Sequence, residues 1–206
     1  PEMQLEALLL LGPTGSGKTP LGDWLERNSL RGRRCHHFDF GAQLRAIVRH
    51  GNGPGAVVPP GAFAPAEVAF LGRVLEKGAL LENRDFHLAL RILDGFVARH
   101  RVQPEDLLVL NGLPRHMDQA TGLESRVRVT RVVQLECSVA VIAERLRLNS
   151  GGDRGGRGDD VGALVRRKLA LYEERTRPLL EFYRGRGVPV TRVEVGVTTR
   201  PEEIQL

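Results

Sequence analysis

The sequence predicts an α/β fold in which a five-stranded parallel sheet is flanked by helices. Two observations carry this prediction. Apolar strand-like runs alternate with helix-like stretches along the chain, a pattern typical of parallel sheets covered by helices. In addition, the first apolar run leads directly into residues 12–19, GPTGSGKT, which match G-x-x-x-x-G-K-[ST] at every position. Because this motif joins a strand to a helix in P-loop proteins, we expect a sheet of the P-loop NTPase type.

Five strands and six helices are predicted in chain order. The strands are expected at residues 7–11, 34–39, 107–110, 129–136 and 189–195. The helices are expected to begin near Lys18, Gly41, Pro65, Asp85, Ser138 and Asp159.

The last two predicted helices have apolar residues at helical spacing. The fifth begins after a candidate N-cap, Ser138, and its predicted apolar face consists of Val139, Ile142, Ala143 and Leu146. The sixth has its predicted apolar face at Val161, Val165, Leu169 and Tyr172. Pro178 is expected to kink this helix or to end its first part.

The P-loop motif predicts a site for the phosphates of ATP with Mg²⁺. Its glycines let the backbone curl until several N–H groups converge on phosphate oxygens, and the helix N-terminus adds positive potential. Lys18 is expected to reach the β- and γ-phosphates, and the Thr19 hydroxyl is expected to face Mg²⁺. The predicted nucleotide-binding residues are Gly12, Pro13, Thr14, Gly15, Ser16, Gly17, Lys18 and Thr19. The alternative is a Gly-rich turn that opens an ordinary helix.

Two stretches do not fit a plain sheet-and-helix sandwich. Residues 51–64 form a Gly/Pro-rich loop, and the helical pair that follows suggests a small helical insertion. Residues 149–158, NSGGDRGGRG, have little to bury and hold Arg154 and Arg157. We interpret this second loop as a mobile lid over phosphates, the alternative being a surface connection.

Composition limits the other functional classes. The chain has 206 residues, 41% of them apolar, which suits one sizeable globular domain. No apolar run reaches bilayer length, and the first residues do not resemble a signal peptide. Cys35 and Cys137 form no CxxC pair, so we expect free thiols. Together these observations predict a cytoplasmic protein. The net charge is +5, but the basic residues are scattered, so nucleic acid is not an expected partner.

Five segments in order resemble the adenylate kinase family of nucleoside monophosphate kinases, in its short-lid form. They are GPTGSGKT, FDFGAQLR, NGLPRHMDQA, ERLRLNSGGDRGGRGDD and VRRKLALYEERTRPLLEFY. The resemblance covers nearly the whole chain. It implies one P-loop kinase domain, with core residues 1–40, 103–148 and 159–206, an NMP-binding insertion at about 41–102 and a lid at about 149–158. It also implies transfer of the γ-phosphoryl group of ATP to a nucleoside monophosphate, AMP being favoured, by a monomer that binds no membrane.

The resemblance implies a role for each matching residue. Phosphoryl transfer brings charged phosphates together, so the site needs fixed cations, and the arginine fork suits phosphate oxygens. The implied catalytic residues are Lys18, Arg115, Arg145, Arg157 and Lys168, of which Arg145 and Arg157 also contact ATP. Arg45 and Arg115 are implied to hold the acceptor phosphate, and Gln119 its base. Phe40, Gly41, Leu81 and Gly112 complete the implied acceptor site, while Asp159 and Asp160 match the lid-hinge acidic pair.

Some of these residues also have ordinary interpretations. Arg45 and Arg49 lie one helical turn apart, which also fits a solvated helix face. Gln119 also fits an exposed polar position, and Asp159 also fits a helix cap.

The chain departs from the family pattern around the expected metal site. The family has Ser/Thr-Thr-Gly-Asp where this chain has residues 39–42, DFGA, so Phe40 replaces a threonine near the acceptor base and Ala42 replaces an acid that helps to hold Mg²⁺. Asn111 replaces the aspartate before G-F-P-R, and it retains the ability to bind a metal-bound water without a charge. Asp39 is the candidate that compensates for the two lost carboxylates.

Further departures concern the phosphate-binding cations. Leu113 replaces the phenylalanine of G-F-P-R, Asn149 replaces a lid-side arginine, and Lys168, next to Arg167, replaces the arginine of the long helix. Lysine retains the charge but not the bidentate fork. The sequence therefore leaves three alternatives: an active kinase with unusual acceptor choice, a nucleotide-binding relative with weak or no catalysis, and a kinase of another small molecule.

Overall fold

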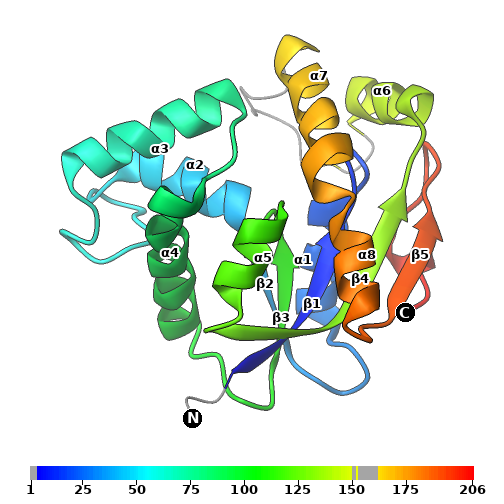
Figure 1. The fold of residues 1–206 in the computed structure, drawn as a ribbon, viewed down its shortest axis with the longest axis horizontal. Helices are drawn as coiled ribbons and strands as arrows, with labels where there is room; N and C mark the ends of the chain where they lie inside the picture. Colours follow the sequence, from blue (N-terminus) through cyan, green and yellow to red (C-terminus); the bar gives the residue numbers. More distant parts are fainter. Residues whose placement is uncertain (1–3, 150–151, 153–161) are drawn as a thin grey trace.

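The computed structural model describes residues 4–149, 152 and 162–206. At its centre is a five-stranded sheet of order β2-β3-β1-β4-β5, in which every neighbouring pair is parallel (Figure 1). The strands are β1 Leu5–Leu11, β2 Cys35–Asp39, β3 Leu107–Asn111, β4 Val127–Glu136 and β5 Val190–Glu194. These are the five predicted strands, and the predicted α/β fold with a parallel sheet is confirmed.

Eight α-helices and three short helical turns accompany these strands within the described residues. The helices are α1 Lys18–Asn28, α2 Phe40–His50, α3 Pro65–Lys77, α4 Phe86–Arg99, α5 Met117–Leu123, α6 Val139–Leu148, α7 Gly162–Leu171 and α8 Leu179–Gly185. The turns are the 3-10 helices η1 Asn83–Asp85 and η3 Pro201–Glu203 and the π-helical η2 Tyr172–Thr176. No helix in the described part is both long and apolar enough to cross a bilayer.

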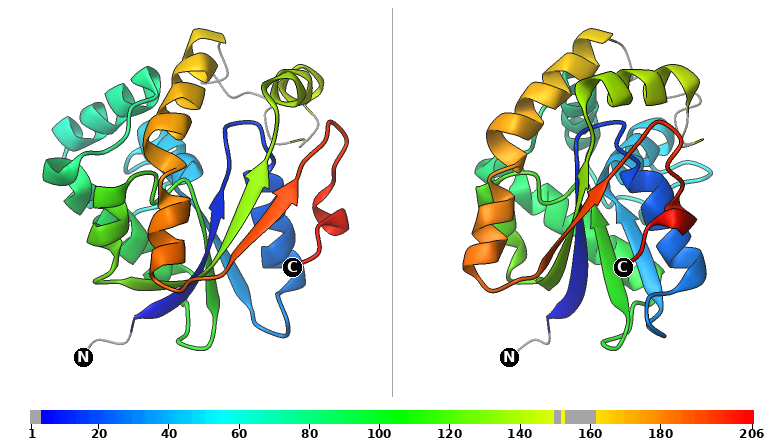
Figure 2. Two further views of the ribbon diagram at one scale, coloured as in Figure 1. Left: turned by 45° about the vertical axis from the view of Figure 1, so that its right-hand side comes forward. Right: turned by 90° about the vertical axis from the view of Figure 1, so that its right-hand side faces the viewer.

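Both faces of the sheet are covered, as the views in Figure 2 show. Side chains alternate between the two faces along a strand. Leu8 and Leu10 of β1 therefore pack with Leu21 and Leu25 of α1. Leu9 and Leu11 belong to the larger cluster on the other face, to which α4, α5 and α8 contribute. The Gly/Pro-rich residues 51–64 form neither helix nor strand, as expected.

The carboxyl ends of the strands lie between two groups of helices. In Figure 1, α2 and α3 stand on one side of this end of the sheet, and α6 and α7 stand on the other. Ligands of open parallel sheets bind at the carboxyl ends of the strands. The arrangement therefore frames a site above β1, β2 and β3.

Three details differ from the predictions. The α5 helix was not predicted because it is short and has no apolar periodicity; the side chain of His116 caps it by accepting the Gln119 N–H. Val139 is 71% exposed and Ala143 is exposed as well, so the predicted apolar face of α6 is wrong at these two residues. The helix meets the P-loop one turn later, where Ile142 and Leu146 lie beside Gly15.

The third difference concerns the long C-terminal helix. It does break before Pro178, as predicted, but the α-helix ends at Leu171 and a π-helical turn fills residues 172–176. Single π-turns of this kind occur often at functional sites, because they shift the side chains that follow them. Here the turn brings Thr176 against the strand-end loop that carries Arg115.

Candidate functional site

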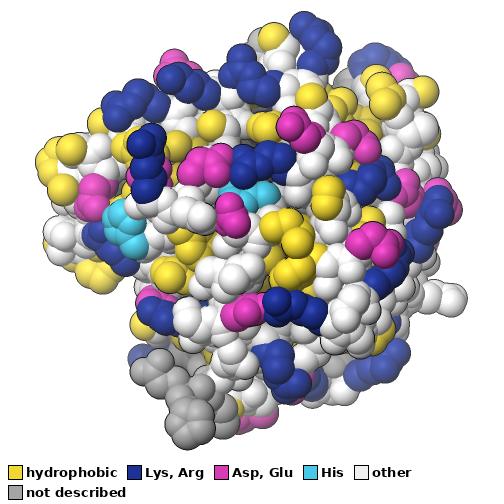
Figure 3. Space-filling view, viewed as in Figure 1, with side chains coloured by type: hydrophobic (Ala, Val, Ile, Leu, Met, Phe, Trp, Pro, Cys, Tyr) yellow, Lys and Arg dark blue, Asp and Glu magenta, His cyan; other side chains and the backbone are white. Residues whose placement is uncertain are grey.

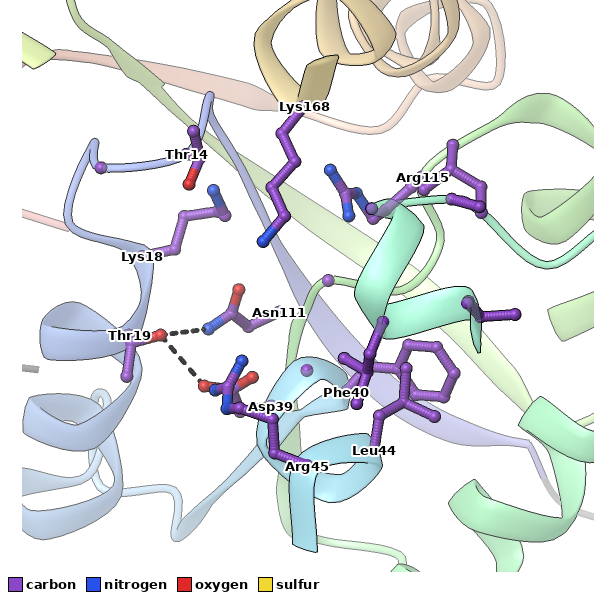
Figure 4. A pocket seen from close by; sticks show the side chains of 18 of the residues that line it. Thr14, Lys18, Thr19, Asp39, Phe40, Leu44, Arg45, Asn111, Arg115 and Lys168 are labelled. Atoms are coloured by element: carbon purple, nitrogen blue, oxygen red, sulfur yellow. Dashed lines mark hydrogen bonds between the residues drawn. The ribbon is translucent and has the colours of Figure 1, made fainter. Parts of the chain in front are cut away.

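One pocket at the carboxyl ends of the strands contains most of the predicted site residues (Figure 4). From the nucleotide side these are Thr14, Gly15, Gly17, Lys18, Thr19, Asn111, Arg145 and Lys168. From the acceptor side they are Phe40, Gly41, Arg45, Leu81, Gly112, Arg115 and Gln119. Gly12, Pro13 and Ser16 belong to the same loop but do not line this pocket, and Ser16 lines a smaller neighbouring one.

The P-loop has the backbone that its glycines permit. Gly15 and Gly17 have φ angles of 82° and 98°, in the left-handed region that favours glycine. The Lys18 ammonium folds back over the loop and donates to the carbonyl oxygens of Gly12 and Pro13 at 2.6 and 3.0 Å. Its amine lies at the wall of the pocket, toward which Lys168 extends from α7 (Figure 4). The loop therefore presents a cation and several backbone N–H groups to an anionic ligand.

Asp39 joins the P-loop helix to the acceptor side. One oxygen of its carboxylate accepts the Thr19 hydroxyl at 3.0 Å, and the other accepts the backbone N–H of Ala42 at 3.0 Å. The second bond caps the N-terminus of α2, the helix that carries Arg45. A carboxylate therefore lies beside the hydroxyl expected to face the metal, although the family position at Ala42 has none.

Asn111 is held by a chain of hydrogen bonds beneath the pocket. Its Nδ2 group lies 3.2 Å from Thr19 Oγ1 and 3.1 Å from His37 Nε2, and His37 Nδ1 lies 2.9 Å from Asp23 Oδ1. If Nδ1 of His37 donates to Asp23, Nε2 accepts from Asn111, and every group in the chain is satisfied. The amide oxygen of Asn111 then turns toward the pocket, as drawn in Figure 4.

Gly22 of α1 makes room for this histidine. A Cβ atom added to Gly22 would lie 2.2 Å from His37 Nε2, far inside contact distance. The His37 side chain is 3% exposed. His37, Asp23 and Gly22 were not predicted as site residues, because their contact joins α1 to β2 and no local spacing signals it.

Arg115 brings a half-buried cation to the acceptor side. Among the described residues its guanidinium forms no ion pair, and burial lowers the pKa of this arginine from its ordinary value. Its backbone is fixed on both sides. The N–H donates to Gln119 Oε1 at 2.7 Å, and the carbonyl accepts the Thr176 hydroxyl at 2.6 Å. A guanidinium placed in this way favours an anionic ligand that supplies the missing charge.

The other acceptor-side residues are positioned by α2 and α5. Arg45 lines the pocket with its guanidinium against Gly41, while Arg49, one turn further, is exposed. Gln119 is buried, and its Nε2 donates to Leu81 O at 3.1 Å. Its amide is thus partly used by the main chain, with one Nε2 hydrogen left over for a ligand.

The acceptor side is more apolar than the sequence analysis predicted. Lining residues that were not predicted include Leu44, Val74, Leu75, Ala79 and Leu80. Phe40, 6% exposed, packs on Phe38 with the ring centroids 6.1 Å apart. The short turn between α3 and η1 supplies Ala79 and Leu80, and nothing in its sequence distinguishes it from an ordinary loop.

Arg145 links the P-loop to the loop after β5. Its Nε donates to Gly15 O at 3.0 Å, and Nη1 lies 2.9 Å from Gly196 O. The side chain is almost fully buried. Its Nη2 faces Gly17, where an added Cβ atom would lie 3.1 Å away. The arginine therefore holds two loops together, whatever it does to a ligand.

Part of the predicted site lies outside the described residues. Arg157, Arg154, Asp159 and Asp160 fall there, together with most of the predicted lid at residues 149–158. Lys168 is described and lines the pocket.

The outer surface has mixed charge. On the face seen in Figure 3, Lys and Arg side chains lie among Asp and Glu side chains. This agrees with the scattered basic residues of the sequence.

Comparison with known proteins gives curated relatives over most of the chain. An adenylate kinase of Prochlorococcus marinus (strain MIT 9303) is 32% identical over 188 residues, which are 89% of this chain and 87% of the relative. One from Synechococcus sp. (strain CC9311) is 32% identical over 189 residues, with coverage of 89% and 87%. One from Synechococcus sp. (strain WH7803) is 30% identical over 207 residues, with coverage of 96% and 97%. No protein-family model matches.

Solved structures share the fold. The unliganded crystal structure of a sugar kinase from Janibacter sp. HTCC2649 aligns with a TM-score of 0.50 and 16% identity, covering 97% of this chain and 89% of that one. A gluconokinase from Sinorhizobium meliloti 1021 aligns with a TM-score of 0.50 and 18% identity, with coverage of 97% and 86%. At these identities the likeness concerns the P-loop kinase fold alone.

Proposed function

The chain belongs to the adenylate kinase family of nucleoside monophosphate kinases and is therefore a phosphotransferase; within that family, we propose that it transfers the γ-phosphoryl group of ATP to AMP. The observation that carries this proposal is the gathering of Lys18, Arg115 and Lys168 around one pocket that also has an apolar acceptor side. Fixed cations of this kind neutralise the phosphate charge that two nucleotides bring together. We propose that the protein acts as a cytoplasmic monomer.

In the proposed donor site, the P-loop backbone and Lys18 hold the phosphates of ATP. Lys18 exchanges its bonds to Gly12 O and Pro13 O for bonds to the β- and γ-phosphates. Arg145 contacts the nucleotide through Nη2, since its other nitrogens are used by backbone carbonyls. Arg157 is proposed to close over the phosphates from the lid.

The oxygen-rich group around Thr19 fits Mg²⁺, which prefers hard oxygen ligands and retains several waters. Thr19 would hold the ion directly, and Asp39 and the Asn111 amide oxygen would hold its waters. Bound there, the ion would neutralise phosphate charge. Asp39 is thus proposed to supply the negative charge that Ala42 and Asn111 no longer provide.

In the proposed acceptor site, Arg45 and Arg115 hold the α-phosphate of the monophosphate. Arg115 has the stronger support, because it lines the pocket and its guanidinium forms no ion pair among the described residues. Gln119 is proposed to bind the base with its remaining Nε2 hydrogen, and Phe40, Leu81 and Gly112 to enclose it. Lys168 lies between the two sites and is proposed to stabilise the transferred group.

A coupled assay of ATP consumption tests the acceptor. AMP, dAMP, CMP, UMP and GMP are compared at equal concentration, with gluconate as an acceptor that has no base. We expect the highest kcat/KM with AMP. Turnover with another monophosphate above AMP would correct the acceptor, and turnover with gluconate alone would overturn the nucleotide assignment.

A specific observation favours a second candidate, a nucleotide-binding relative with weak catalysis. Two acids near the metal are replaced, at Ala42 and Asn111. The same assay separates the candidates when ATP binding is measured alongside. Binding of ATP together with no turnover of any monophosphate would favour this second function.

A further inference from the structure

Three side chains of types that bind metals lie together away from the nucleotide pocket, at an edge of the sheet. Glu26 comes from α1, His36 from β2 and His100 from the end of α4, and their candidate ligand atoms lie within 4.8 Å of one another. Because β2 is an edge strand, α1 on one face and α4 on the other approach each other around it. None of the three residues lines the nucleotide pocket.

His36 is already oriented as a metal ligand would be. Its Nε2 lies 2.8 Å from Asp106 Oδ2, and its side chain is 4% exposed. Asp106 also accepts the backbone N–H of Gln103 at 2.9 Å, so the carboxylate is fixed. When Nε2 donates to Asp106, Nδ1 retains its lone pair. A carboxylate behind a histidine is the usual support of a zinc-binding imidazole.

The other two side chains also have contacts of their own. Glu26 Oε1 accepts the backbone N–H of His37 at 3.1 Å, which leaves Oε2 as the oxygen available for coordination. The His100 ring stacks on Phe96 with centroids 3.9 Å apart.

We propose that Glu26, His36 and His100 bind one Zn²⁺ ion in a His₂Glu site with a fourth position open to water. The ligand atoms of a tetrahedral zinc site lie about 3.3 Å apart, whereas the three candidate atoms lie within 4.8 Å of one another. The side chains therefore move closer together when the ion binds, and exposed Glu26 has room to do so. The ion links α1, β2 and α4 across the sheet edge. It binds only the folded chain and therefore stabilises it, and it lies outside the nucleotide pocket.

Arg99 competes with the metal in this arrangement. Its Nη2 lies 3.2 Å from His100 Nε2, so it donates to that nitrogen and places the ring hydrogen on Nδ1. Coordination through either nitrogen of His100 therefore requires Arg99 to leave. Replacing Arg99 by glutamine should strengthen metal binding, an effect that a merely structural cluster would not produce.

The test is a calorimetric titration of Zn²⁺ into the metal-stripped full chain, with the visible spectrum of bound Co²⁺ and the Tm as further readouts. We expect one ion per chain, a tetrahedral Co²⁺ spectrum and a higher Tm with Zn²⁺. His100→Ala and Glu26→Gln should abolish all three, whereas His87→Ala, at an exposed histidine elsewhere, should abolish none. Asp106→Asn should weaken binding by about 10- to 100-fold.

His36→Ala is a poor test because it leaves the Asp106 carboxylate buried without its partner, which destabilises the fold. The decision therefore rests on the more accessible residues. Absence of saturable one-to-one binding by the wild-type chain would overturn the proposal. Binding by His100→Ala as tight as by the wild type would also overturn it, because the ion would then lie elsewhere, for example in the nucleotide pocket.

Discussion

Among single residues, Lys18 has the largest expected effect. Its ammonium donates to Gly12 O and Pro13 O, and the phosphates of ATP would take over these bonds. Removal of one preorganised charge of this kind costs on the order of 10²- to 10³-fold in kcat. We expect a loss of that size in Lys18→Ala, measured by the coupled assay. Lys77→Ala, at the exposed end of α3, is the control, and equal turnover in the two variants would contradict the P-loop assignment.

The residues around Thr19 make a second prediction at this scale. Ala42→Asp combined with Asn111→Asp restores the two family acids, and the added negative charge should lower the Mg²⁺ concentration needed for half-maximal activity. Asn111 now donates to His37 Nε2, so an aspartate there requires His37 to donate instead. Ala42→Asp alone leaves that bond intact and is the matched control. An unchanged Mg²⁺ requirement in both variants would mean that Asp39 already supplies the needed charge.

At the scale of the helix, Gly22 connects α1 to the floor of the site. A Cβ atom there would lie 2.2 Å from His37 Nε2, and the buried ring has little room to move. Gly22→Ala should lower the free energy of unfolding by about 1–3 kcal/mol through overpacking. A Cβ atom at Gly95 in α4 would have nothing within 4 Å. Gly95→Ala should therefore raise the free energy of unfolding by about 0.5–1 kcal/mol. Urea denaturation of both variants checks the prediction, and similar effects would show that His37 is not confined.

The π-helical turn η2 makes a second prediction at the scale of the element. Thr176→Val removes the hydroxyl that donates to Arg115 O at 2.6 Å. An orphaned carbonyl costs about 1–3 kcal/mol of stability, and the Arg115 loop should loosen. We therefore expect the KM for the monophosphate to rise more than the KM for ATP. The control is Thr121→Val, which removes an exposed hydroxyl that donates to Met117 O. It should change neither the free energy of unfolding nor the two KM values. A loss of stability without a change in KM would separate the turn from the acceptor site.

The elements themselves could be predicted where one local signal decides them. The strand and P-loop predictions rest on apolar runs and on a complete motif, so all five strands were found. The acceptor side depends on contacts between distant segments, such as Gln119 with Leu81 O. Neither residue carries a signal for that pairing. Likewise the α5 helix is stabilised by its His116 cap and by packing rather than by periodicity.

At the scale of the whole molecule, the pocket receives side chains from both groups of helices. Lys18 and Lys168 approach from the P-loop and α7, whereas Arg45 and Leu81 belong to the segment between β2 and β3. A ligand that reaches both groups therefore ties together parts of the chain that are distant in sequence. A ligand of the P-loop alone contacts only one of them.

This architecture predicts the response to a bisubstrate inhibitor, two adenosines joined by five phosphates. The compound fills both proposed sites in one association step, so it should bind more tightly than ATP or AMP. Only the folded chain has these sites, so at about 100 times its Kd it should raise the Tm by about 5–10 °C. Thermal shift at matched concentrations of ATP, AMP and the inhibitor measures the effect.

Lys18→Ala is the control variant, and it should reduce the Tm shift for ATP and for the inhibitor but leave the Tm shift for AMP unchanged. If the inhibitor raised the Tm of the wild type no more than ATP does, the acceptor side would not bind a nucleotide, and the proposed reaction would lose its second substrate.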